Sequence, residues 1–180
     1  MAPSLQSLLD QIENQRSAIL NSIRSLSTAQ LTHSPAQGQW SLAQVLSHIM
    51  SAERLSVGYI QKKALGIDAA QQSGLWEEFK IQLLIVSQRL PGLKFRAPRR
   101  VVENTAQFSD LASIEASWDQ IRNDLRALLE NIPSHQVNRL LYKHPVAGYL
   151  DVRHALIFFR EHIIHHQPQI ERLRNQIPSV

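Results

Sequence analysis

The sequence predicts an all-α protein, and three observations support this fold class. Five segments carry apolar residues at intervals of three and four, which is the spacing of one face of an α-helix. No segment shows a convincing strand pattern, and the connections between the periodic segments are short to medium in length. We therefore predict an up-down four-helix bundle with an additional helix and long loops, folded as a single domain over residues 1–180.

The first two helices are predicted over residues 4–26 and 42–63. Ser41 precedes the second helix and is a suitable N-cap. Between the two, residues 27–39 are polar and interrupted by proline and glycine, so we expect a loop. The apolar stripes are Leu5, Leu8, Leu9, Ile12, Ile19, Ile23 and Leu26 in the first helix, and Leu42, Val45, Ile49, Ala52 and Tyr59 in the second.

A third helix is predicted over residues 75–90, after a small polar connection at residues 66–74, and Pro91 ends it. This helix can belong to the bundle core or lie outside a core of four helices, and the sequence leaves both arrangements open. Its apolar residues, again three and four apart, are Trp76, Phe79, Leu83, Val86 and Leu90.

The remaining two helices are predicted over residues 110–132 and 151–175, with loops at 91–109 and 134–148. The fourth helix has a regular seam in which apolar residues alternate at intervals of four and three. Its members are Ile114, Trp118, Ile121, Leu125, Leu128 and Ile132.

The composition excludes several classes of protein. The chain has no cysteine, which removes disulfides, thiolate metal ligands and a cysteine nucleophile. No apolar run approaches the roughly 18–20 residues that cross a bilayer, and the first residues show no secretory signal. We therefore expect a protein that is not embedded in a membrane and is located in the cytoplasm.

The net charge of +4 raises the question of nucleic-acid binding. Most basic residues are scattered among acidic ones, and the one dense run, Lys94 to Arg100, lies in an expected loop. A basic loop is more often solvated surface than a binding site, so we do not expect nucleic acid as a partner.

Three histidines on apolar stripes indicate a metal site. His162 and His166 are four residues apart, so they are neighbours on one helix face and can converge on one ion. His48 lies between Val45 and Ala52 on the stripe of the second helix, where it can supply a third ligand. The stripe that contains the first two histidines also contains Val152, Ala155, Phe159, Ile170 and Leu173.

These histidines also have a structural interpretation. A core histidine is often hydrogen-bonded to the backbone or to a glutamate, and helix ends gather histidines for electrostatic reasons. Either way the buried imidazoles need partners, because an unpaired buried polar group costs about 1–3 kcal/mol. If the partner is a metal, three histidines leave one coordination position open for water or substrate, as in catalytic zinc sites.

Two motifs lie toward opposite ends of the chain. In the first, Gln39-Trp40-Ser41-Leu42-Ala43-Gln44-Val45-Leu46-Ser47-His48-Ile49 is followed by Glu53. In the second, His144-Pro145 and Gly148 precede His162-Ile163-Ile164-His165-His166 and then Gln169-Ile170. Together they resemble the DinB/YfiT-like family of metalloenzymes, and the similarity covers nearly the whole chain in element order.

The resemblance implies a DinB-like helical bundle with one divalent metal ion bound by three histidines. Matched by position, the ligands are His48, His162 and His166, the trio that helical periodicity also selects. Zinc and nickel are the metals we expect, since both accept neutral imidazole ligands. Many members of the family resemble dimers, so a homodimer is also implied.

The family is similar to enzymes of two kinds, metal-dependent hydrolases and transferases that use a low-molecular-weight thiol. The resemblance therefore implies a metal-dependent enzyme with a small-molecule substrate. A thiol would have to arrive as a cosubstrate, because the chain has no cysteine. A non-catalytic metal-binding or stress-response protein is the alternative.

Other residues have less certain roles at the predicted site. Glu53 either orients a ligand histidine or lies at the surface, and Gln169 can hydrogen-bond a ligand or a metal-bound water. No residue is identified as catalytic, and Glu161 as a general base is a minor alternative. The three tryptophans, Trp40, Trp76 and Trp118, are interpreted as packing anchors.

Overall fold

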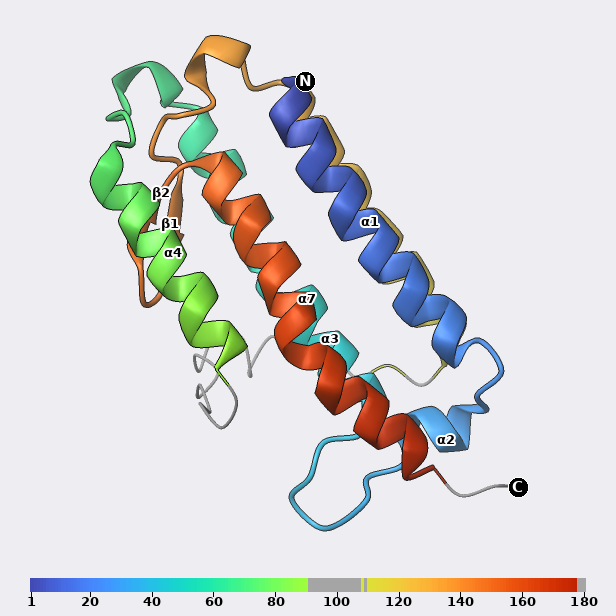
Figure 1. The fold of residues 1–180 in the computed structure, drawn as a ribbon. Helices are drawn as coiled ribbons and strands as arrows, with labels where there is room; N and C mark the ends of the chain where they lie inside the picture. Colours follow the sequence, from blue (N-terminus) through green and yellow to red (C-terminus); the bar gives the residue numbers. More distant parts are fainter. Residues whose placement is uncertain (91–107, 109, 178–180) are drawn as a thin grey trace.

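The computed structural model describes residues 1–90, 108 and 110–177, and its architecture is a helical bundle. The long helices alternate in direction along the chain (Figure 1), and the predicted all-α bundle is confirmed. The five long helices are α1 (Pro3–Ile23), α3 (Leu42–Ala64), α4 (Leu75–Arg89), α6 (Leu111–Glu130) and α7 (Val152–Asn175).

Four of these helices form the centre of the bundle, and α4 lies at its edge, where Ile81 and Leu84 join the same hydrophobic core. α7 packs against α1 and α3, and α3 packs against α6. α4 packs on α7 at the edge of the molecule (Figure 1). The arrangement is therefore a four-helix core with one peripheral helix, one of the two arrangements that the sequence left open.

The core contains large apolar side chains from all four helices. Trp118 of α6 and Phe159 of α7 are fully buried, together with Leu5, Leu9 and Ile12 of α1. Burying a large apolar side chain contributes about 1.5–3 kcal/mol. The interpretation of Trp118 as a packing anchor is confirmed.

A charged network crosses this core between α3, α6 and α1. Glu53 is fully buried, and its carboxylate accepts hydrogen bonds from Trp118 Nε1 at 2.8 Å and Arg122 Nη2 at 2.9 Å. Arg122 Nε also pairs with Glu13 at 2.6 Å. Glu53 follows His48 by five residues, which turns it about 140° around the helix and toward α6. It is therefore not a surface carboxylate, and its partners belong to the packing of the bundle.

Two short elements depart from the sequence prediction. The loop expected at 27–39 contains helix α2 (Thr28–Thr32), capped by Ser27. The loop expected at 134–148 contains strand β1 (Tyr142–His144), which pairs antiparallel with β2 (Gly148–Leu150) although no strand was predicted. Elements of three to five residues are too short to show a period in the sequence. Gly148 has a φ of 73°, which side-chain-bearing residues rarely adopt.

The exposed face of α4 contradicts one sequence interpretation. Trp76 is 64% exposed, so it is not a packing anchor. The side chains of α4 that are buried are Ile81, Leu84 and Gln88. The apolar stripe that identifies this helix therefore faces solvent, because α7 packs against a different face.

No described helix has both the length and the apolarity needed to span a membrane. The basic run from Lys94 to Arg100 lies outside the described residues, so the prediction about it is not addressed by the structure.

Candidate metal centre

His48 is positioned by the capped start of α3. Ser41 and Gln44 form a reciprocal capping box: the Ser41 hydroxyl accepts from the Gln44 amide at 3.3 Å, and Gln44 Oε1 accepts from the Ser41 amide at 2.8 Å. This box fixes the first residue of the helix and hence the direction of each later side chain. His48 follows two turns later on the buried face, with 6% of its surface exposed.

The two other histidines are positioned by the capped start of α7. Asp151 accepts from the His154 amide at 3.0 Å and ends the β-hairpin connection. His162 and His166 lie on one face of the helix, three and four turns further on. The same face contains Phe159 and Ile170, which are buried in the core.

These helices bring the three imidazoles together. Each ring can contribute one nitrogen such that all three atoms lie within 4.8 Å of one another. The ring centroids are 4.7 Å apart for His162 and His166, and 4.9 and 5.1 Å from His48. Among the described residues, no carboxylate belongs to this group.

The closest pair of nitrogens has the separation of two ligands on one ion. His162 Nε2 and His166 Nε2 are 3.2 Å apart. Two nitrogens bound to a tetrahedral zinc at about 2.0–2.1 Å are about 3.3 Å apart. The distance also suits an N–H···N hydrogen bond between the two rings.

Gln169 selects the tautomer of His166 that a metal requires. Its side-chain carbonyl oxygen lies 3.0 Å from His166 Nδ1 and accepts the proton of that nitrogen. With the proton on Nδ1, the lone pair of Nε2 is free to bind an ion, and an outer partner of this kind also fixes the ring orientation. The contact expected between Gln169 and a ligand histidine is therefore present.

Burial keeps the three rings neutral at physiological pH. Desolvation lowers the pKa of His48 and of His166 to about 4, and that of His162 to well below its ordinary value. The Nδ1 atoms of His48 and His162 are buried without a hydrogen-bond partner. Neutral imidazoles with unpaired nitrogens in a buried cluster are a donor set that fits a transition metal.

Aromatic residues surround the cluster. The Trp40 ring lies 5.2 Å from that of His48, and Phe158 stacks on His162 at 5.2 Å. His144 also contacts Phe158, with the two ring centroids 4.6 Å apart. Its Nδ1 accepts from the amides of Val146 and Ala147, which leaves the proton on Nε2, and burial lowers its pKa to about 4. Sequence periodicity did not identify Phe158 as part of the site, because its neighbour Phe159 lies on the core stripe.

The two residues adjacent to the ligand pair serve the packing of α4. His165 Nδ1 contacts the Gln88 carbonyl at 2.8 Å. Glu161 is buried and bonded to both Arg89 and Arg160. Burial raises the pKa of Glu161, but the hydrogen bonds with the two arginines outweigh this and lower it. A carboxylate held by two guanidinium groups is a weak base, so the structure does not favour Glu161 as a general base.

A second group of potential ligands is already neutralised. Glu78, Asp151 and His154 also place one ligand atom each within 4.8 Å of the others. Arg153 Nη2, however, binds Glu78 at 2.8 Å and Asp151 at 2.7 Å. The guanidinium thus supplies the positive charge that a metal would bring, and this cluster joins the starts of α4 and α7.

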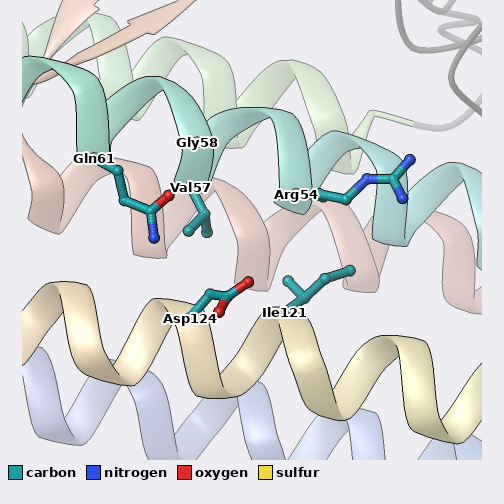
Figure 2. Close-up of a pocket in the computed structure, with 6 residues that line it drawn as sticks. All are labelled: Arg54, Val57, Gly58, Gln61, Ile121 and Asp124. Atoms are coloured by element: carbon teal, nitrogen blue, oxygen red, sulfur yellow. The ribbon is translucent and has the colours of Figure 1, made fainter.

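A shallow hollow of about 130 Å³ lies between α3 and α6, away from the three histidines. Figure 2 shows Gln61 of α3 and Asp124 of α6 on opposite sides of it, with Arg54 at one end. Its lining contains none of the histidines, so it is not the pocket of the candidate metal centre.

Comparisons with known proteins agree with this fold. A family model described as the DinB superfamily matches residues 11–170. The uncharacterised protein YuaE of Bacillus subtilis is 23% identical over 157 residues, which cover 87% of this chain and 91% of YuaE. The structure of YfiT from Bacillus subtilis, described as a probable metal-dependent hydrolase with an unusual four-helix bundle topology, is also similar. It has a TM-score of 0.59 and 16% identity, covering 97% of this chain and 89% of YfiT.

Proposed function

Because this chain belongs to the DinB superfamily, we propose that it binds one divalent transition metal ion through His48, His162 and His166. The observation that carries the proposal is the pair of Nε2 atoms 3.2 Å apart, with Gln169 holding the proton of His166 on its other nitrogen. We propose zinc or nickel, since neutral imidazole suits both.

The composition of the site favours catalysis over a purely structural role. Three neutral imidazoles bring no negative charge to balance a divalent ion, and three protein ligands leave a coordination position for another molecule. A metal bound there would supply Lewis acidity that lowers the pKa of a water or thiol reaching it. Trp40 and Phe158 contribute apolar walls beside the rings, which exclude bulk water from the cluster.

We propose that the activity is metal-dependent hydrolysis of a small molecule. The similarity to YfiT supports this reaction class, since that protein is described as a probable metal-dependent hydrolase. Transfer of a low-molecular-weight thiol is the second candidate, because the same Lewis acidity activates a thiol. The chain contains no cysteine, so the sulfur would come from a cosubstrate.

Metal content tests the binding proposal directly. Elemental analysis of the untagged protein should find about one equivalent of a transition metal, and His162→Ala should lose it. His165→Ala is the matched control, since this neighbouring imidazole contacts the Gln88 carbonyl and is outside the ligand group. If the wild-type protein contains no metal and takes up neither added zinc nor added nickel, the proposal is wrong.

Activity requires a separate assay. The metal-loaded protein and His162→Ala should be compared on a panel of ester and amide substrates, with and without an added low-molecular-weight thiol. Turnover without thiol that His162→Ala abolishes supports a hydrolase, and turnover only with thiol supports a transferase. A metal-loaded protein that gives neither supports a non-catalytic metal-binding role.

A further inference from the structure

The outward face of α4 is apolar along its whole length. Of the eight exposed side chains between residues 75 and 90, six are apolar and two are polar. The polar ones are Gln82 and Arg89, and Arg89 is paired with Glu161. The apolar ones, with their exposed fractions, are Leu75 (89%), Trp76 (64%), Phe79 (56%), Leu83 (59%), Val86 (54%) and Leu90 (50%). We call these six residues the α4 face.

The spacing of the α4 face is that of a helix-pairing seam. Trp76, Phe79, Leu83, Val86 and Leu90 follow one another by three, four, three and four residues. Two apolar residues in every seven, on a stripe distinct from the buried residues Ile81 and Leu84, are typical of a helix that packs against a second helix. α7 covers one side of α4 (Figure 1). The seam residues are exposed, so they lie on another side of the helix.

The exposed area matches the requirement of a dimer. Large apolar side chains present roughly 150–250 Å² each when free. With the exposed fractions above, the α4 face offers roughly 560–930 Å² of apolar surface. A stable interface buries about 800 Å² on each partner, and exposed apolar patches of this size on soluble chains mark interaction sites.

The order of side chains along the seam is suited to pairing with itself in the antiparallel direction. Leu83 lies at its midpoint. A two-fold axis beside Leu83 places Trp76 opposite Leu90 of the second copy, and Phe79 opposite Val86, so that each large side chain meets a smaller one. Parallel pairing would instead place the two tryptophans against each other. We propose that two copies of this chain form a homodimer through antiparallel contact of their α4 faces.

A second copy is the partner that this chemistry favours. The α4 face has no unpaired charge, so it offers nothing to a partner recognised by its charges. An isologous interface needs a patch that is complementary to itself, and the large-to-small order along the seam provides that. This proposal is independent of the metal site.

Sedimentation of the full-length protein tests the proposal. The wild-type chain should sediment at twice the 20.5 kDa of one chain, in a reversible equilibrium. Leu83→Glu places two carboxylates at the two-fold axis and should weaken association at least about a hundredfold, since opposed like charges cost several kcal/mol. Ala116→Glu on α6 adds the same charge at another exposed helical position and should leave the dimer intact. A monomeric wild type, or a dimer that Leu83→Glu does not weaken, overturns the proposal.

Two complementary pairings test the symmetry. Leu83→Glu and Leu83→Lys should each be monomeric alone and form a heterodimer when mixed, because the axis places position 83 opposite itself. The chain has no cysteine, so introduced thiols report contacts without background. Phe79→Cys mixed with Val86→Cys should cross-link under mild oxidation as a heterodimer. Failure of that pair to cross-link, with efficient self-linking of Phe79→Cys, would refute the antiparallel arrangement.

Discussion

Acid should destabilise the metal-free protein strongly, because burial lowers the pKa of four histidines. That of His162 is lowered to well below its ordinary value. The pKa values of His48, His144 and His166 are lowered from an ordinary 6.5 to about 4 by burial. Above pH 6.5 these rings are neutral in both the folded and the unfolded chain, and folding is insensitive to pH. Between pH 6.5 and 4 only the unfolded chain takes up protons, so stability falls through this window and the loss is complete below pH 4.

The size of the effect follows from the shifts. At pH 5 each ring is 1.5 pH units below its unfolded pKa and still neutral in the folded chain, which costs about 2 kcal/mol per ring. The three rings together would cost about 6 kcal/mol, out of a total stability of about 5–15 kcal/mol for a domain. The metal-free protein should therefore lose most of its stability between about pH 7.5 and pH 5.

Urea unfolding of chelator-treated protein at these two pH values measures the loss. His144→Gln removes one of the three rings without touching a proposed ligand, so about 2 kcal/mol of the pH-dependent loss should disappear. His33→Gln is the control, since His33 is exposed. A wild-type loss below about 1 kcal/mol between the two pH values would refute the reasoning, because the rings would then be solvated.

Three further predictions concern single side chains. Gln169→Leu should weaken metal binding by about 10–100-fold, because His166 loses the hydrogen bond that sets its tautomer. Gln167→Leu changes an exposed amide and should leave metal binding unchanged. Competition with a chelating dye measures both affinities. Glu53→Ala should destabilise the protein by about 3–5 kcal/mol, because it leaves Arg122 in the core without this partner. Glu115→Ala breaks an exposed ion pair and should cost at most about 1 kcal/mol. Equal urea midpoints for the two variants would contradict this prediction. Trp118→Ala should cost about 3–5 kcal/mol and Trp76→Ala less than about 1 kcal/mol in dilute protein, and thermal unfolding distinguishes the buried from the exposed ring.

The long helices were predictable because each repeats its apolar residues over many turns. α3 and α7 were predicted to within a residue or two, and their caps, Ser41 and Asp151, are visible in the sequence. The convergence of His48 with the His162 and His166 pair was also predictable, since all three lie on apolar stripes that must meet in the core. The short hairpin was not, because β1 and β2 have three residues each and depend on the turn at Gly148.

The environment of a carboxylate was harder to predict than that of an apolar residue. Glu53 and Glu161 are both buried, yet sequence patterns give acidic residues to the surface by default. Each is buried because an arginine from another helix reaches it: Arg122 from α6 in one case and Arg89 from α4 in the other. Such pairs join residues 69 and 72 positions apart, and a single sequence contains no signal of that contact.

The α4 face shows a related limit: a helical stripe reveals which side is apolar but not what covers it. The α4 face is separate from the three histidines, so the dimer proposal and the metal proposal can be tested independently. α4 contacts α7, which contains His162 and His166, through Gln88 and Arg89. Leu83 is exposed on a different side of α4. Leu83→Glu should therefore become monomeric and still contain the metal found in the wild type, as elemental analysis of the monomer fraction would measure. If the monomer loses the metal while its helical content is unchanged, the dimer contributes to the site and the two proposals are not independent.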